Sequence, residues 1–332
     1  MATDFKGYLL EEFLEDYQEG LITRREAAKL IGGIVGSLAL ADVLLAACSP
    51  AAGNGSSPTV VPAIATVVGA SPVPSASPAA PEASASGPED SASAGTSAAA
   101  TPAESGDITF PGEDATLLGY LARSAGDGPF PAVLVCHENR GLTDHIRDVA
   151  RRLASAGYVG LAVDLLSRLG GTAAAGDESQ IPGLLGNMPP DQFVQDFAAA
   201  WRWLQAQPYV RPERVGMVGF CFGGGVTWRV AIGLADVSAA VPFYGPHPDP
   251  AELESVQAAV LAIYAGRDTR INQSIPAVEA AMQQYGKIYE KVVYPETDHA
   301  FHNDTGSRYD PQAATDAWAR TLAWFNQYVA TP

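Results

Sequence analysis

Hydrophobic and polar residues alternate in blocks along the C-terminal part of this chain of 332 residues. Short apolar runs, typical of buried strands, are separated by stretches with the apolar period of a helix. The expected strands are residues 108–110, 116–123, 132–136, 159–163, 215–218, 239–243, 260–264 and 291–294. The expected helices are residues 144–156, 191–205, 225–235, 276–285 and 312–328. This alternation predicts an α/β fold with a doubly wound, mostly parallel sheet, helices on both faces and a leading antiparallel strand pair.

The part of the chain before this pattern has no means of building a hydrophobic core. Residues 49–105 are nearly all Ala, Ser, Pro, Gly, Thr and Val, with no aromatic residue and no Lys or Arg. Such a composition buries too little apolar surface to offset the entropy cost of ordering, so we expect a disordered spacer. Residues 106–332 have the length and the apolar content of one globular domain.

The N-terminal segment, residues 1–48, has the features of an export signal. Arg24 and Arg25 precede an apolar stretch at 30–47, and these paired arginines resemble a twin-arginine signal, although Ala27 stands where a large apolar residue is usual. The stretch ends in a Leu-Ala-Ala-Cys tetrad that resembles a lipobox, in which Cys48 is lipidated and becomes the mature N-terminus. We therefore expect an exported protein that is attached to the membrane by a lipid, on its extracytoplasmic face.

A transmembrane anchor is the alternative for the same stretch, which is about long enough to span a bilayer. However, it is rich in Ala and Gly and contains Asp42, which costs roughly 2.5 to 3.5 kcal/mol at the centre of a membrane. These features favour a cleaved signal. Ahead of it, residues 9–17 form an acidic amphipathic pattern to which the sequence assigns no function.

Charge and cysteine content exclude several classes of protein. The net charge of the chain is −17, and residues 106–332 carry 25 acidic against 16 basic residues, a net charge of −9. An acidic domain without a basic run is a poor candidate for binding nucleic acid. Of the three cysteines, Cys48 belongs to the lipobox, while Cys136 and Cys221 lie in or beside predicted strands, so a disulfide framework is not expected.

The strongest chemical motif is a Gly-x-Cys-x-Gly turn between a predicted strand and a predicted helix. Gly219 and Gly223 allow a sharp turn that exposes the side chain of Cys221, as in a nucleophile elbow. An acid and a base, Asp268 and His299, then follow in the order found in α/β-hydrolases. The alternative is a buried structural cysteine in a glycine-rich turn.

These residues suggest a division of roles. A cysteine attacks as its thiolate, so Cys221 needs a base, and the dipole of the following helix favours the anion. His299 lies just beyond a strand and is the expected base, with His302 as the alternative, and Asp268 would orient the imidazole. Asp298, adjacent to His299, is better explained as a loop cap. The backbone N–H groups of Asn139 and Phe222 could form the oxyanion hole.

This set of motifs resembles the dienelactone hydrolase family. The resemblance spans residues 106–332 and rests on the cysteine turn, on His137 and Glu138 after an early strand, and on short motifs at 243–245, 266–268 and 298–301. It implies a triad of Cys221, Asp268 and His299, with Glu138 holding the thiol at rest and helping to form the thiolate. Cys136 is expected to pack in its strand, and His137 to cap a loop or fill the core.

One departure from the family concerns the substrate. Members that hydrolyse dienelactone bind its carboxylate through arginines, one of them four residues after the catalytic histidine, where this chain has Asn303. Arg140 and Arg168 are the candidates to replace the missing arginines, and Tyr244 is a third candidate for substrate contact. A neutral ester or lactone is therefore the expected small-molecule substrate.

Two other functional classes fit parts of the sequence. A lipoprotein could use the same fold to bind a ligand without turnover, and Asp298, His299 and His302 could be read as metal ligands. The second hypothesis is weak because no third dedicated ligand accompanies the two histidines. The prediction is a hydrolase that forms an acyl-enzyme and requires neither a metal nor another cofactor.

Overall fold

The computed structural model describes residues 4–48 and 104–331. The described residues belong to one compact unit, and a second unit, 50–98, lies outside them. The spacer predicted at 49–105 therefore falls outside the described residues except for its last two positions, which begin the first strand.

A single eight-stranded sheet forms the centre of the domain, with the strand order β1-β2-β4-β3-β5-β6-β7-β8. β1 pairs antiparallel with β2, and β2 with β4, while all later neighbours are parallel. The predicted α/β fold with a mostly parallel sheet is confirmed. The strands are β1 (Glu104–Pro111), β2 (Thr116–Arg123), β3 (Phe130–Cys136), β4 (Val159–Asp164), β5 (Val210–Phe220), β6 (Val237–Phe243), β7 (Ala259–Ala265) and β8 (Tyr289–Tyr294).

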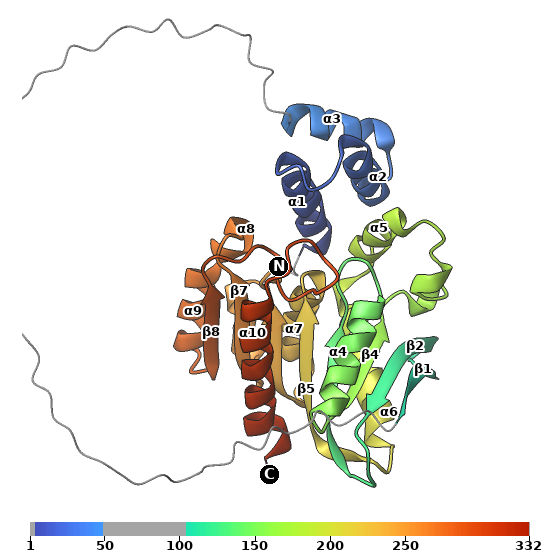
Figure 1. Cartoon of the computed structure of the whole chain (residues 1–332), viewed down its shortest axis with the longest axis vertical. Coiled ribbons are helices and arrows are strands. Elements are labelled where there is room, and N and C mark those ends of the chain that lie inside the picture. The colour runs from blue at the N-terminus through green and yellow to red at the C-terminus, as the bar shows by residue number, and fades with distance from the viewer. Residues whose placement is uncertain (1–3, 49–103, 332) are drawn as a thin grey trace, which may run out of the picture. The chain divides into compact units, whose positions relative to one another are not determined.

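Helices cover both faces of this sheet. In Figure 1, α4 and α10 cross in front of the strands and α7 lies behind them. The α-helices are α4 (Asp144–Ser155), α5 (Ile181–Gly186), α6 (Pro190–Gln205), α7 (Phe222–Gly233), α8 (Thr269–Asn272), α9 (Ile275–Gln284) and α10 (Pro311–Phe325). The shorter helical turns are η1 (Ser167–Leu169), η2 (Thr172–Ala174), η3 (Glu178–Gln180), η4 (Pro250–Ser255) and η5 (Asn326–Ala330).

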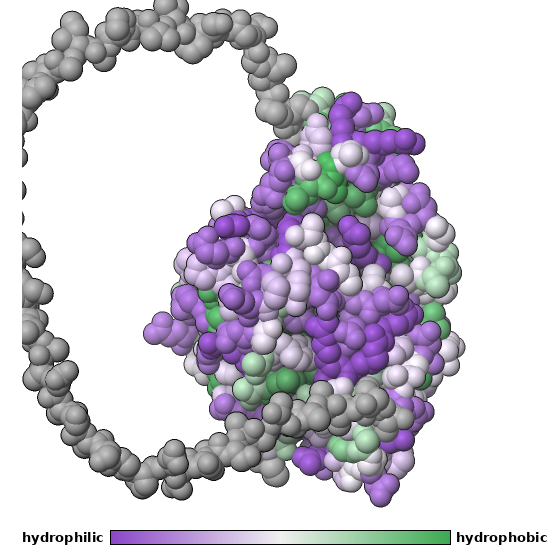
Figure 2. Space-filling model, in the orientation of Figure 1, coloured by the Kyte–Doolittle hydropathy of each residue, from purple (hydrophilic) through white to green (hydrophobic). Residues whose placement is uncertain are grey.

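Helix α4 illustrates how the sequence pattern produces this packing. Its apolar residues recur at helical spacing, and Ile146, Val149 and Leu153 are fully buried. Arg151 and Arg152 lie on the other face, where both pair with the carboxylate of Asp148. The outer surface over α4 is accordingly hydrophilic in Figure 2.

The inner strands are mostly buried because helices cover both faces of the sheet. Every residue of β4 and β7 is buried, and so are the last six residues of β5. This is why these strands appear in the sequence as continuous apolar runs. Their carboxyl ends meet at one edge of the sheet, where the site is built.

Three helices precede the sheet in the described part of the chain: α1 (Phe5–Gln18), α2 (Arg24–Val35) and α3 (Leu38–Cys48). The apolar stretch 30–47 is divided between α2 and α3, because Gly36 adopts a left-handed conformation (φ 73°) that ends α2. Leu9, Ile31 and Leu45, one from each helix, are fully buried. No helix within residues 4–48 and 104–331 is long and apolar enough to cross a bilayer.

Candidate active site

The sharp turn predicted from the sequence is present between β5 and α7. Cys221 occupies the turn with φ 56° and ψ −122°, a conformation that L-residues rarely adopt. Both flanking glycines are required: a Cβ on Gly219 would lie 2.2 Å from the carbonyl oxygen of Gly223, and one on Gly223 would lie 2.4 Å from that of His137. The thiol therefore stands at the amino end of α7, above the sheet.

An aspartate and a histidine lie on the neighbouring loops. Asp268 follows β7 and His299 follows β8, and Nδ1 of His299 lies 2.6 Å from Oδ2 of Asp268. The other oxygen of Asp268 accepts a hydrogen bond from the backbone N–H of Ile271, 3.1 Å away, which fixes the carboxylate. Nε2 of His299 makes no hydrogen bond to any described residue. A ring nitrogen of His299 and the sulfur of Cys221 lie within 4.8 Å of each other.

The charges of this histidine and aspartate stabilise each other. Burial lowers the pKa of His299, but the charge and the hydrogen bond of Asp268, together with the neighbouring Cys221, outweigh burial and hold this pKa well above its usual value. Asp268 is also stabilised in its charged form. Burial raises the pKa of its carboxyl, but His299 lowers this pKa by more, so the net shift is downward. The Asp268 carboxylate thus stabilises the protonated imidazole of His299.

The thiol itself is held in its protonated form. Burial raises the pKa of Cys221, and the carboxylate of Glu12 adds to the increase, while His299 opposes it. Oε1 and Oε2 of Glu12 lie 3.4 Å and 3.6 Å from Sγ and accept its hydrogen bond, and the Tyr8 hydroxyl lies 3.4 Å away. The side-chain amide of Asn139 donates to Oε1 of Glu12 over 2.9 Å.

Sequence reasoning missed Tyr8 and Glu12, which both belong to α1. The acidic amphipathic pattern at 9–17 was the one signal of their segment, and it indicates a helix but not what the helix contacts.

Glu138, which the family resemblance places against the thiol, lines the same cavity but has another partner. Its Oε2 accepts a hydrogen bond of 2.7 Å from the side-chain amide of Asn303, the residue found where an arginine was expected. Burial raises the pKa of the Glu138 carboxyl. The carboxylate in contact with Cys221 is that of Glu12.

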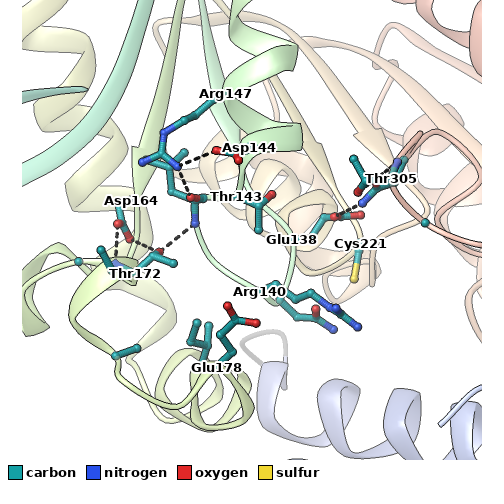
Figure 3. A pocket seen from close by; sticks show the side chains of 18 of the residues that line it. Glu138, Arg140, Thr143, Asp144, Arg147, Asp164, Thr172, Glu178, Cys221 and Thr305 are labelled. Atoms are coloured by element: carbon teal, nitrogen blue, oxygen red, sulfur yellow. Dashed lines mark hydrogen bonds and ion pairs between the residues drawn. The ribbon is translucent and has the colours of Figure 1, made fainter. Parts of the chain in front are cut away.

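A cavity of about 1100 Å³ brings most of the predicted site residues together. Its walls include Cys221, His299, Glu138, Asn139 and Arg140. In Figure 3 the sulfur of Cys221 points into the cavity, with Glu138 and Arg140 beside it.

Two of the predicted substrate contacts are not part of the cavity wall. Arg168 pairs with the buried Asp196 at 3.0 Å. Tyr244 is fully buried, and its ring packs against His299 with the ring centroids 4.9 Å apart. Tyr244 therefore supports the histidine from behind.

The predicted oxyanion amides come from two different segments of the chain. Asn139 is in the loop after β3, and Phe222 is the first residue of α7. Within the described part of the chain, neither of these N–H groups donates a hydrogen bond to a protein acceptor. Both remain available to an oxygen that develops negative charge.

The remaining candidates have structural roles. His302 stacks on Phe220 with the ring centroids 4.9 Å apart, and burial lowers its pKa to about 3, so it is not the partner of Asp268. His137 accepts a hydrogen bond from the backbone of Leu165 and thereby links the ends of two strands. Asp298 is half exposed and lies 3.6 Å from Arg267.

The metal hypothesis based on Asp298, His299 and His302 is not supported, because these side chains do not converge. Among the described residues, the group whose geometry could hold a metal ion is Glu12, Cys221 and His299. A metal there would occupy the thiol and the imidazole themselves.

Comparisons with known proteins identify the family and the fold of this chain. The sequence profile of the dienelactone hydrolase family matches residues 117–329. A "Putative carboxymethylenebutenolidase" of Methylorubrum extorquens is 35% identical over 236 residues, which cover 68% of this chain and 81% of the relative. The crystal structure of a "Putative Dienelactone Hydrolase" from Klebsiella pneumoniae superposes with a TM-score of 0.64 at 32% identity, covering 68% of this chain and 99% of that one. A dienelactone hydrolase-like promiscuous phosphotriesterase from metagenomic libraries has a TM-score of 0.60 at 26% identity, covering 68% and 98% of the two chains.

Proposed function

This chain belongs to the dienelactone hydrolase family and is a hydrolase of ester or lactone bonds, and we propose that it acts through a cysteine nucleophile, Cys221. The observation that supports this proposal best is the position of Cys221 in a strained elbow, close to a histidine that is bonded to a buried aspartate. A merely structural cysteine needs neither the strain nor the histidine.

In the proposed reaction, His299 takes the proton of the Cys221 thiol, and the sulfur attacks the carbonyl carbon of the substrate. The tetrahedral oxyanion is stabilised by the N–H groups of Asn139 and Phe222, each worth roughly 2.7 to 4 kcal/mol. The C–O bond then breaks, and the leaving alkoxide receives the proton from His299. In a lactone, this new hydroxyl stays attached to the acyl group.

The second half of the reaction regenerates the enzyme. His299 accepts a proton from a water molecule, which attacks the thioester and displaces the sulfur. The products are a carboxylic acid and the free thiol, which recovers its proton. Asp268 stays ionised throughout and keeps the imidazole in place. Glu138 has the role that the family resemblance implies, which is to assist formation of the thiolate when substrate binds.

The charges around the cavity bear on the substrate class. Its described lining includes seven carboxylates but three guanidinium groups. Arg147 is paired with Asp107 and Arg308 with Asp16, so within the described residues Arg140 is the cavity arginine that has no carboxylate partner. A substrate carboxylate that enters a partly buried cleft without a cation loses several kcal/mol.

Because, among the described residues, seven carboxylates line the cavity beside the one unpaired arginine, we expect the full-length enzyme to hydrolyse neutral esters and lactones at least as efficiently as dienelactone. The measurement is kcat/KM for dienelactone and for an uncharged lactone of similar size, at low and at moderate salt. A preference of a hundredfold or more for dienelactone, about 2.7 kcal/mol in transition-state binding, would contradict this expectation. Loss of that preference in Arg140→Gln or in Arg308→Gln would then identify the cation.

We also propose that the enzyme is exported and attached to the membrane by a lipid on Cys48. Arg24 and Arg25 are exposed at the start of α2 and are accessible to an export receptor. A lipobox-like tetrad ends at Cys48. A route that carries folded proteins would suit a domain that needs a free thiol.

Cys48→Ala is expected to release the protein from the membrane fraction or to leave it as an uncleaved precursor, because the lipid chains supply the anchor. The measurement is cell fractionation together with the N-terminal sequence and the mass of the product. Cys136→Ala serves as the matched control, since that cysteine is buried in β3. Unchanged membrane association of Cys48→Ala with an intact N-terminus would favour retention of the segment.

A further inference from the structure

The space in front of the Cys221 sulfur is already occupied by groups from α1. The carboxylate oxygens of Glu12 lie 3.4 Å and 3.6 Å from Sγ, and the Tyr8 hydroxyl lies 3.4 Å from it. An attacking sulfur needs the substrate carbonyl carbon about 3 to 3.5 Å away. A substrate and these two side chains cannot occupy the same positions, and Cys221 is accordingly only 3% exposed.

Glu12 carries the same chemical group as the product of ester hydrolysis, and it lies where that product would lie. Its side chain ends in a carboxylate, as the acid released by ester hydrolysis does. One oxygen accepts a hydrogen bond from the side chain of Asn139, in the loop that also holds a predicted oxyanion amide. Glu12 itself is 5% exposed. A buried carboxylate costs free energy unless it is bonded, and here it is bonded to the groups of the active site.

The rest of α1 holds Glu12 in this position through two kinds of contact. At one end, Phe5 packs between Phe193 and Phe222, with ring centroids 5.6 Å and 4.9 Å away, so it touches the residue next to the nucleophile. Phe5 is 2% exposed.

The acidic face of α1 supplies the second kind of contact. Glu15 pairs with Arg270 and Asp16 with Arg308, each at 3.0 Å, and the four side chains are between 11% and 33% exposed. The guanidinium of Arg270 also lies 4.6 Å from the centroid of the Tyr8 ring. This face gives residues 9–17 the function that the sequence did not reveal.

We propose that α1 is an intramolecular inhibitor of this enzyme, with Glu12 occupying the position of the substrate acyl group until α1 leaves. The inference rests on the proposed role of Cys221 as the nucleophile. It assigns two states to the chain: a closed state with α1 docked, and an open state in which Cys221, Arg270 and Arg308 are uncovered. Removal of residues 1–47 during export would make the open state permanent.

The electrostatics of the thiol agree with the closed state being inactive. Burial and the Glu12 carboxylate both raise the pKa of Cys221. Departure of α1 removes that carboxylate and admits water, so the pKa falls and the thiolate fraction at neutral pH rises. Release of α1 thus increases both access to the sulfur and its reactivity.

The test loosens α1 in the full chain by two independent routes and follows alkylation of Cys221 by iodoacetamide. Phe5→Ala removes the aromatic anchor, and the double variant Glu15→Gln/Asp16→Asn removes both ion pairs. Truncation of a buried aromatic ring can shift a docking equilibrium by more than an order of magnitude. We expect each variant to alkylate at least about tenfold faster than the wild type and to show a higher kcat/KM for a small neutral ester.

Glu11→Gln is the matched control, because Glu11 is an exposed acid of the same helix. It should alkylate at the wild-type rate. Mass spectrometry of the peptide that contains Cys221 restricts the measurement to this thiol, and thermal unfolding shows whether the hydrolase domain is intact. Unchanged or slower alkylation in both loosened variants would overturn the proposal, and slower turnover in both would instead make α1 a part of the working site.

Two further variants distinguish the role of the Glu12 carboxylate from that of Glu138. They also allow the inhibitor proposal and the proposed mechanism to be tested separately. Glu12→Ala should accelerate alkylation and move its pH midpoint downward, while Glu138→Gln tests in the same assay whether Glu138 promotes the thiolate. Faster alkylation without ester turnover in any variant would support the proposal that α1 covers Cys221, and it would reject the proposed mechanism of hydrolysis. Turnover that depends on Cys221, with alkylation unaffected by the state of α1, would reject the inhibitor alone.

Discussion

Replacing Cys221 with alanine is expected to lower kcat/KM for ester and lactone hydrolysis on the order of 10⁴-fold while leaving the fold intact. In the proposed mechanism the thiol forms the covalent intermediate, and without it only the oxyanion donors and substrate binding remain. The sulfur is small and sits at the edge of the sheet, so its loss creates little cavity. The measurement is steady-state kinetics with an activated ester, accompanied by circular dichroism and thermal unfolding.

The second buried thiol offers a matched control. Cys136 lies at the end of β3, and its Sγ lies 3.8 Å from the carbonyl oxygen of His137, so Cys136→Ala should retain turnover. Wild-type turnover in Cys221→Ala would reject the cysteine mechanism. A loss of activity in both variants together with a lower melting temperature would indicate a packing defect and not a catalytic one.

Asp268→Asn is expected to lower kcat by roughly 10³ to 10⁴-fold, because an amide in this position favours the wrong tautomer of His299. The acid limb of the pH–rate profile should also move. Since the Asp268 carboxylate raises the pKa of His299, its removal lowers that pKa, and the imidazole loses its proton at a lower pH. The measurement is kcat/KM as a function of pH for the wild type and the variant.

Asp298→Asn provides the comparison for this prediction. Asp298 is adjacent to the histidine in sequence, but its side chain is half exposed and faces Arg267. We expect its neutralisation to change kcat/KM by less than about threefold, as for an exposed ion pair. If the two variants were equally impaired, or if Asp268→Asn kept the wild-type pH profile, Asp268 would not be the residue that orients His299.

Local patterns in the sequence were sufficient to predict the sheet and the elbow. Strand β2 was predicted at its observed bounds, and the helix predicted at 144–156 corresponds to α4 (Asp144–Ser155). These predictions hold because burial on both faces leaves continuous apolar runs, and a helix with one buried face leaves a periodic pattern. The elbow could also be predicted, because neither Gly219 nor Gly223 has room for a Cβ and the turn therefore requires two glycines at these positions.

The order of motifs along the chain also predicted which residues meet. Asp268 and His299 each follow a strand of the same parallel sheet, and parallel strands end at the same edge. The hydrogen bond between them is therefore a consequence of topology. The choice between His299 and His302 depended on the tertiary structure, because only packing buries His302 against Phe220 and lowers its pKa.

Sequence patterns did not predict the contacts of the N-terminal segment. Its apolar stretch at 30–47 suggested one continuous segment, whereas Gly36 divides it into two helices that pack with α1. The contact between Glu12 and Cys221 joins residues that are 209 positions apart. No periodicity or motif encodes a contact of that kind, because it depends on how complete elements pack and on which charges then face each other. Local patterns and spacing thus specify the fold and the turn that holds Cys221, and only the packing of α1 places Glu12 and Tyr8 against its sulfur.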